Sequence, residues 1–117
     1  MFWTLSQVAL GGAIGSVLRY LTVTAFGAPL ATLVVNVLGS FVMGILFVVL
    51  SSRTHLSPLL MTGILGGFTT FSAFSLDALK LWQAGQFPQA ALYVGASVVF
   101  SLLAVALGAA LAKGALG

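Results

Sequence analysis

The chain has no cysteine, one histidine and one acidic residue, and each shortage narrows the possible functions. Without cysteine there are no disulfide bridges and no thiolate chemistry. A single carboxylate, Asp77, and a single imidazole, His55, supply no acid–base pair, no activated nucleophile and no cluster of metal-binding side chains. We therefore expect a protein that is not an enzyme.

Basic residues are also few. Arg19, Arg53, Lys80 and Lys113 give the chain a net charge of +3 at pH 7. A basic chain often binds nucleic acid, but these four residues are scattered and form neither a patch nor a stripe. We therefore expect no nucleic-acid partner.

Apolar residues, in contrast, are plentiful, because 61% of the chain is hydrophobic and only 4% is charged. Four apolar runs, at residues 2–26, 29–50, 56–82 and 87–111, are each long enough to supply the ~20 helical residues that cross a bilayer. The breaks between these runs are short, so consecutive helices must be antiparallel neighbours. The sequence predicts an all-α integral membrane protein in which residues 1–117 form a single domain of four transmembrane helices in the lipid bilayer.

The basic residues are divided evenly between the two ends of these helices. With four spans both termini lie on one side of the membrane, together with Arg53 and Lys113, and the other side carries Arg19 and Lys80. A bias of Lys and Arg toward the cytoplasm normally decides orientation, so an even division predicts insertion both ways round. Chance balance in a short, weakly charged chain is the alternative, and charge alone does not separate the two interpretations.

Two spans carry polar residues four positions apart, along one face of each helix. These are Thr32, Asn36 and Ser40 in the second span, followed by Gly44, and Tyr93, Ser97 and Ser101 in the fourth. For the serines alone, contact between packed helices is the simpler interpretation. Asn36 is different, because its amide has more donors and acceptors than one helix can satisfy, which favours a functional group inside the membrane.

The first span places Gly11, Gly15 and Arg19 on one face. The two glycines are typical of closely packed helices rather than of a site. For Arg19 two interpretations stay open. Its side chain either extends to the lipid headgroups or forms a positive charge at the mouth of a water-filled vestibule that attracts anions.

The third span contains the unusual stretch "GGFTTFSAF", from Gly66 to Phe74, with Thr69 at the middle of the span. Paired glycines and hydroxyl side chains weaken a helix, so we expect an unwound turn here. Unwinding frees carbonyl oxygens that lipid cannot satisfy and that suit a hard monovalent cation. In a dimer of oppositely oriented chains this turn would meet its own copy and form a cage of four oxygens.

Phe71 and Phe74 lie three positions apart and therefore share a helix face. The edge of an aromatic ring carries partial positive charge and can face an anion. A role in the core or against lipid is the ordinary alternative. The neighbouring hydroxyls and the expected helix break weaken that alternative.

Three segments, "GGAIGSVLRY", "PLATLVVNVLG" and "GGFTTFSAFSLD", resemble in order and separation the signature segments of the Fluc/CrcB family of bacterial fluoride channels. The resemblance covers nearly the whole chain. It implies a dual-topology antiparallel homodimer in the bacterial inner membrane, with two pores that export fluoride and a central structural sodium ion. The sequence departs from the family pattern at Ala31, Ala73 and Asp77, where Gly, Thr and Glu are usual.

Carried over residue by residue, the resemblance also suggests individual roles. The backbone oxygens of Gly66 and Thr69 would bind sodium. The fluoride path would be lined by Asn36, Phe71 and Phe74 and continued by Tyr93, Ser97, Ser101 and Thr32, with Arg19 as the vestibule charge. The contact made by Asp77, and the choice between a homodimer and a heterodimer with a sister subunit, are left open.

A small four-span multidrug exporter coupled to protons is the main alternative. Such a transporter needs a carboxylate inside the bundle that can be protonated. Asp77 is the single acid and lies two turns beyond the expected break, so this alternative ranks well below the channel. A structural membrane subunit would explain the glycines but neither Asn36 nor the break.

Overall fold

The computed structural model describes residues 1–50 and 54–116, and every regular element in them is helical. In chain order these elements are α1 (Phe2–Phe26), α2 (Leu30–Val49), the short 3₁₀ turn η1 (Thr54–Leu56), the π-helix η2 (Pro58–Leu65), α3 (Gly66–Phe68), α4 (Phe71–Gln83) and α5 (Phe87–Leu116). Arg53, part of the charge argument above, lies outside the described residues.

Four segments of the described chain are long and apolar enough to cross a membrane: α1, α2, the composite segment Pro58–Gln83 and α5. The prediction of a multi-pass helical membrane protein is thereby confirmed. The last helix continues beyond the expected end at residue 111, as far as Leu116. Its extra turn is rich in alanine, which favours the helical state.

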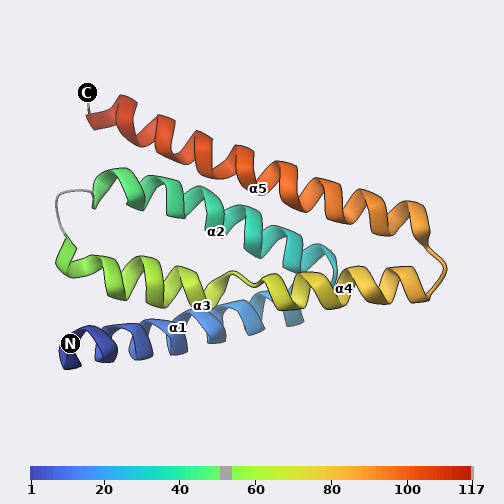
Figure 1. The fold of residues 1–117 in the computed structure, drawn as a ribbon, viewed down its shortest axis with the longest axis horizontal. Helices are drawn as coiled ribbons and strands as arrows, with labels where there is room; N and C mark the ends of the chain where they lie inside the picture. Colours follow the sequence, from blue (N-terminus) through green and yellow to red (C-terminus); the bar gives the residue numbers. More distant parts are fainter. Residues whose placement is uncertain (51–53, 117) are drawn as a thin grey trace.

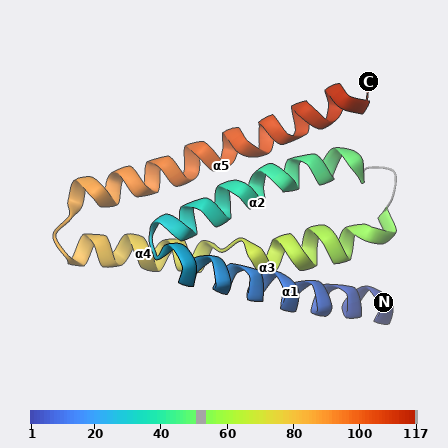
Figure 2. The ribbon, with the colours of Figure 1, turned by 180° about the vertical axis from the view of Figure 1, so that it is seen from behind.

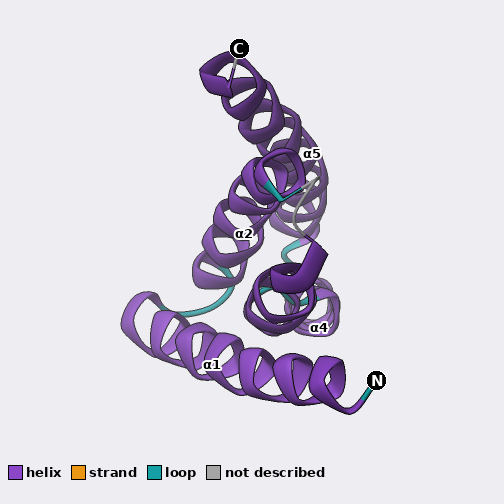
Figure 3. Cartoon of the chain, turned by 90° about the vertical axis from the view of Figure 1, so that its left-hand side faces the viewer, coloured by secondary structure: helices purple, strands orange, loops and turns teal. Residues whose placement is uncertain are grey.

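The third span changes its packing partner along its length. In Figure 1 and in the reverse view of Figure 2, it runs between α2 and α1, with α5 on the far side of α2 and both termini at one end of the molecule. Its first half, η2 and α3, packs along α1, whereas its second half, α4, packs on α5. Figure 3 shows the same order of helices from the end. The change of partner takes place between α3 and α4.

Glycines allow the helices to come unusually close. A Cβ atom on Gly11 would lie 2.5 Å from the carbonyl oxygen of Leu59, and one on Gly15 would overlap the carbonyl oxygen of Ile64. In the other pair of helices, a Cβ on Gly108 would overlap the backbone of Phe41 in α2. The expected packing role of Gly11 and Gly15 is therefore confirmed, and it fixes α1 against the first half of the third span.

Little of the chain is enclosed by the chain itself. Ala31 and Val35 of α2 are fully buried, but large apolar side chains point outward from every span, such as Val17 in α1 and Leu102 in α5. Lipid or another protein chain must cover these faces, because exposed apolar surface of this extent is unfavourable in water.

Candidate functional site

The third span is interrupted at two residues. Helix α3 ends at Phe68, Thr69 (φ −82°, ψ 157°) and Thr70 (φ −154°, ψ 126°) are extended, and α4 begins at Phe71. The unwound turn expected around Thr69 is therefore confirmed. The Thr69 N–H still donates to the carbonyl of Leu65 at 3.0 Å, but the helical hydrogen-bond pattern stops after it, so the groups that it leaves unpaired need other partners.

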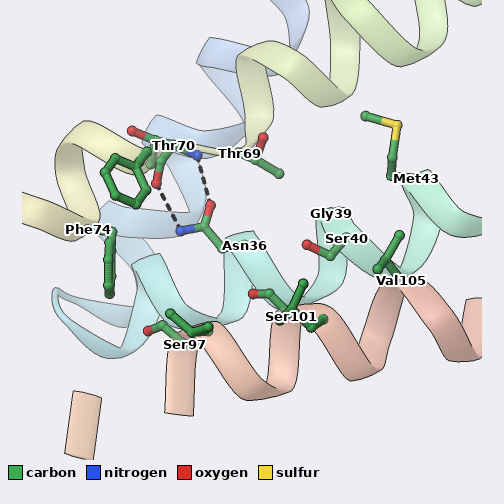
Figure 4. A pocket seen from close by; sticks show the side chains of 13 residues that line it. Asn36, Gly39, Ser40, Met43, Thr69, Thr70, Phe74, Ser97, Ser101 and Val105 are labelled. Atoms are coloured by element: carbon green, nitrogen blue, oxygen red, sulfur yellow. Dashed lines mark hydrogen bonds between the residues drawn. The ribbon is translucent and has the colours of Figure 1, made fainter. Parts of the chain in front are cut away.

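Asn36 of α2 supplies partners to both backbone groups of Thr70. Its Nδ2 donates to the carbonyl oxygen of Thr70 at 2.9 Å, and the Thr70 N–H donates to its Oδ1 at 2.8 Å, as the dashed lines in Figure 4 show. The Thr70 hydroxyl then accepts from the N–H of Ala73 at 3.2 Å and caps the start of α4. Asn36 thus pairs with both backbone groups of Thr70, and within the described residues the second hydrogen of its amide has no partner.

The break leaves the carbonyls of residues 66–69 without their helical donors. In a continuous α-helix the N–H of Thr70 would donate to Gly66, and that of Ala73 would donate to Thr69. Both N–H groups are instead directed to side chains, the first to Asn36 and the second to the Thr70 hydroxyl. Gly66 and Thr69, the residues expected to bind sodium, are therefore two of the four residues whose carbonyls lose a helical donor at the break.

Arg19 reaches the break from the other side. Its Nε donates to the carbonyl oxygen of Gly67 at 3.2 Å, and the residue is half-buried. Both interpretations of Arg19 that the sequence left open stay predictions, and the structure adds a contact that neither includes. It places the guanidinium beside the unwound turn, and within the described residues the remaining guanidinium N–H groups have no hydrogen-bond partner.

A pocket of about 420 Å³ lies beside the break, between α2 and α5. It is lined by Asn36, Gly39, Ser40, Met43, Thr69, Thr70, Phe71, Phe74, Ser97, Val98, Ser101, Leu102 and Val105. Figure 4 shows the amide of Asn36, the ring of Phe74 and the two α5 serines around it. The structure thus brings together five of the residues expected along the fluoride path: Asn36, Phe71, Phe74, Ser97 and Ser101.

The aromatic rings form a short chain beside this pocket. The ring centroids of Phe71 and Phe74 are 5.5 Å apart, and those of Phe74 and Tyr93 are 5.4 Å apart. Phe74 is buried, whereas Phe71 is 77% exposed. The two phenylalanines therefore face the same region, and Phe71 projects beyond what this chain alone covers.

Ser97 contributes an unused polar atom. The residue is 6% exposed, and within the described chain its hydroxyl is buried without a hydrogen-bond partner. Leaving a buried hydroxyl unpaired costs about 1–3 kcal/mol, so a ligand or water molecule that pairs with it gains stability. Together with the amide of Asn36, this hydroxyl gives the pocket two polar groups that can donate hydrogen bonds.

Thr32 and Tyr93 do not line the pocket but converge on Asp77. The Thr32 hydroxyl donates to Asp77 Oδ2 at 2.8 Å, and the Tyr93 hydroxyl donates to the same oxygen at 3.3 Å. Asp77 is 8% exposed and also borders a second cavity, of about 230 Å³, with Lys80 and Pro29. These three polar residues therefore form a separate cluster behind the ring of Phe74.

Comparison with known proteins places this arrangement in a family. A family model described as "CrcB-like protein, Camphor Resistance (CrcB)" matches residues 6–109. The chain belongs to the CrcB family. It is similar to a protein named "Fluoride-specific ion channel FluC" from Cereibacter sphaeroides (strain ATCC 17029 / ATH 2.4.9), with 53% identity over 97% of this chain and 98% of the relative. A protein of the same name from Ruegeria sp. (strain TM1040) is 52% identical over 99% of each chain. A third, from Paracoccus denitrificans, is 50% identical over 95% of each chain.

The sequence leaves the contacts of one buried residue of this CrcB chain, Asp77, unassigned. Its place three residues after Phe74 puts it on the same helix face. That spacing, with Thr32 and Tyr93 as hydroxyl donors on other spans, is the signal that could have found the cluster. The CrcB chain has no group of three His, Cys, Asp or Glu side chains in its described part, so a cation at the break would need backbone oxygens.

Proposed function

We propose that this chain is a subunit of a fluoride-selective channel that lets the anion leave the cytoplasm across the bacterial inner membrane. The observation that carries this proposal is a donor-lined pocket at the middle of a broken membrane span, in a chain about half identical over its length to proteins named fluoride-specific ion channels. Such a protein conducts an ion and catalyses no covalent reaction.

Fluoride is small and strongly hydrated, so a path through lipid must replace its water molecules with other hydrogen-bond donors. The free amide hydrogen of Asn36 and the hydroxyls of Ser97 and Ser101 are suitable donors, and the ring edges of Phe71 and Phe74 add weaker attraction. No charged side chain is among the residues that line the pocket. The ion is therefore held by neutral donors, which favours release.

A second, oppositely oriented copy would complete the pocket. The exposed ring of Phe71 and the outward apolar faces of the spans need cover, and a partner chain of the same sequence supplies matching apolar surface. A two-fold axis in the membrane plane would bring the break of each chain onto its own copy. The even division of basic residues supports insertion in both orientations.

A sodium ion at the break would join the two copies. The carbonyl oxygens of Gly66 and Thr69 can fill this role, because both have lost their helical donors, whereas the neighbouring Gly67 carbonyl already accepts from Arg19. Two oxygens from each chain would hold the ion, and its contribution would be structural, through stabilisation of the dimer.

Reconstitution of the purified protein into liposomes tests the function. We expect rapid fluoride efflux, little chloride efflux under the same gradient, and no proton-driven uptake of a cationic dye. Equal rates for fluoride and chloride would contradict selectivity. Dye uptake in response to a pH gradient would instead indicate the exporter alternative, with Asp77 as its proton-binding residue.

A further inference from the structure

The backbone of the break is held by side chains from two helices that lie on either side of it (Figure 1). Asn36 of α2 pairs with the N–H and carbonyl of Thr70, and Arg19 of α1 pairs with the carbonyl of Gly67. These contacts divide the exposed carbonyls into two groups. Those of Gly67 and Thr70 have side-chain donors, whereas that of Gly66 has lost its helical donor to Asn36.

The close packing of α1 brings Arg19 to this position. Gly15 lies one turn before Arg19 on the same face, and its lack of a side chain lets α1 touch the backbone of Ile64 just before the break. With α1 this close to the third span, the Nε of Arg19 donates to the Gly67 carbonyl at 3.2 Å. A planar guanidinium suits such a fixed bond better than the point charge of a lysine does.

Charge alone gives no reason for this contact. A positive side chain beside a cation site repels the cation, so an Arg19 that acted only through its charge would weaken sodium binding. Its hydrogen bond has the opposite effect if it fixes the orientation of the peptide between Gly67 and Phe68, because the neighbouring carbonyls of Gly66 and Thr69 are then pre-arranged.

We propose that Arg19 is a positioning residue for the cation site: by holding the Gly67 carbonyl it keeps those of Gly66 and Thr69 turned toward the ion. This inference rests on the sodium site of the proposed function. It assigns Arg19 a role on the backbone of the break that is independent of any attraction of anions.

The decisive measurement is the sodium concentration that gives half-maximal fluoride efflux from liposomes containing the full-length protein. Replacement of Arg19 by Met removes both charge and donor at nearly the same length. If Arg19 positions the carbonyls, Arg19→Met should raise this concentration about tenfold, the effect of one hydrogen bond to a charged group. If Arg19 acts only by charge, the concentration should fall.

Lys80→Met is the matched control, because it removes one positive charge from the same end of the bundle. In the described structure Lys80 makes no hydrogen bond to the break, so its loss should leave the half-maximal sodium concentration unchanged. An equal rise in both variants would show that the effect does not depend on the contact with the Gly67 carbonyl and would overturn the inference.

Arg19→Lys covers the case in which Arg19→Met does not assemble. It keeps the charge but moves the donor, so positioning predicts a smaller rise and a charge-only role predicts none. A sodium-dependent wild type with an unchanged or lower value for the Arg19 variants would refute the positioning role alone. A wild type that conducts equally in sodium and in a bulky organic cation would refute the sodium site, and the inference with it.

Discussion

Replacing Asn36 by Asp gives the sharpest test of the pocket, because it replaces the amide NH2 by an oxygen and keeps the shape of the side chain. The oxygen that accepts from the Thr70 N–H is retained, but Nδ2 becomes an oxygen that faces the Thr70 carbonyl at a position where the amide donated at 2.9 Å. Two acceptors then oppose each other. The amide hydrogen that is free for the permeating ion is lost at the same time.

The two losses have different magnitudes and different readouts. Loss of the bond to the Thr70 carbonyl removes one donor from a part-buried oxygen and sets a second acceptor against it, which costs about 1–3 kcal/mol, or about 5- to 150-fold in an equilibrium constant. This lowers the thermal stability of the protein without preventing assembly. The effect on fluoride permeation is larger, since an ionised carboxylate offers no hydrogen-bond donor and repels the anion. We expect efflux to fall below detection.

Gln7→Glu is the matched control, since it makes the same amide-to-acid change at another buried side chain. The Gln7 Nε2 donates to the carbonyl oxygen of His55 at 3.0 Å, away from the pocket. We expect a comparable loss of thermal stability and normal efflux for each folded dimer. Wild-type efflux from Asn36→Asp vesicles, at equal protein incorporation, would refute the assignment of Asn36 to the ion path.

Three further predictions concern the aromatic rings, the helix packing and the orientation. Phe71→Ile and Phe74→Ile keep apolar bulk but remove the positive ring edge, so liposome efflux should fall steeply in both; normal efflux would indicate a packing role. Gly108→Val should lower the thermal midpoint by overlapping the backbone of α2, whereas Gly114→Ala, where a Cβ meets no atom within 4 Å, should not. Two lysines added after Lys113 should bias the chain to one orientation, as tag accessibility reports, and reduce the amount of active channel. Co-expression with an oppositely biased copy should restore efflux. Failure of that rescue with both copies inserted would contradict the antiparallel dimer.

The four spans and the break could be predicted because local composition determines them. Apolar runs of sufficient length must be helical in lipid, where the backbone has no water to bond with. Paired glycines followed by Thr69 and Thr70 weaken the helix wherever it is placed. Asn36 was singled out for a similar reason, since an amide at membrane depth needs partners.

The partners of these residues could not be predicted, because they depend on how the helices pack. The contact of Arg19 with Gly67 requires the close approach of α1, and the reciprocal bonds of Asn36 require the extended backbone of Thr70. The wide turns of η2 (Pro58–Leu65) have no sequence signal either. For Arg19 and Asn36 the deciding contact joins residues far apart in the chain.

The interruption of the third span also divides its electric field. A continuous helix concentrates its partial charges at its two ends, which for a membrane span lie near the two surfaces. Because α3 ends at Phe68 and α4 starts at Phe71, a negative carbonyl end and a positive amide end instead meet within one turn, deep between the two ends of the span. The carbonyl end of α3 can therefore favour a cation on one side of the break, and the amide end of α4 can favour an anion on the other. Hydrocarbon at this depth would solvate neither ion, and the residues that line the pocket carry no formal charge.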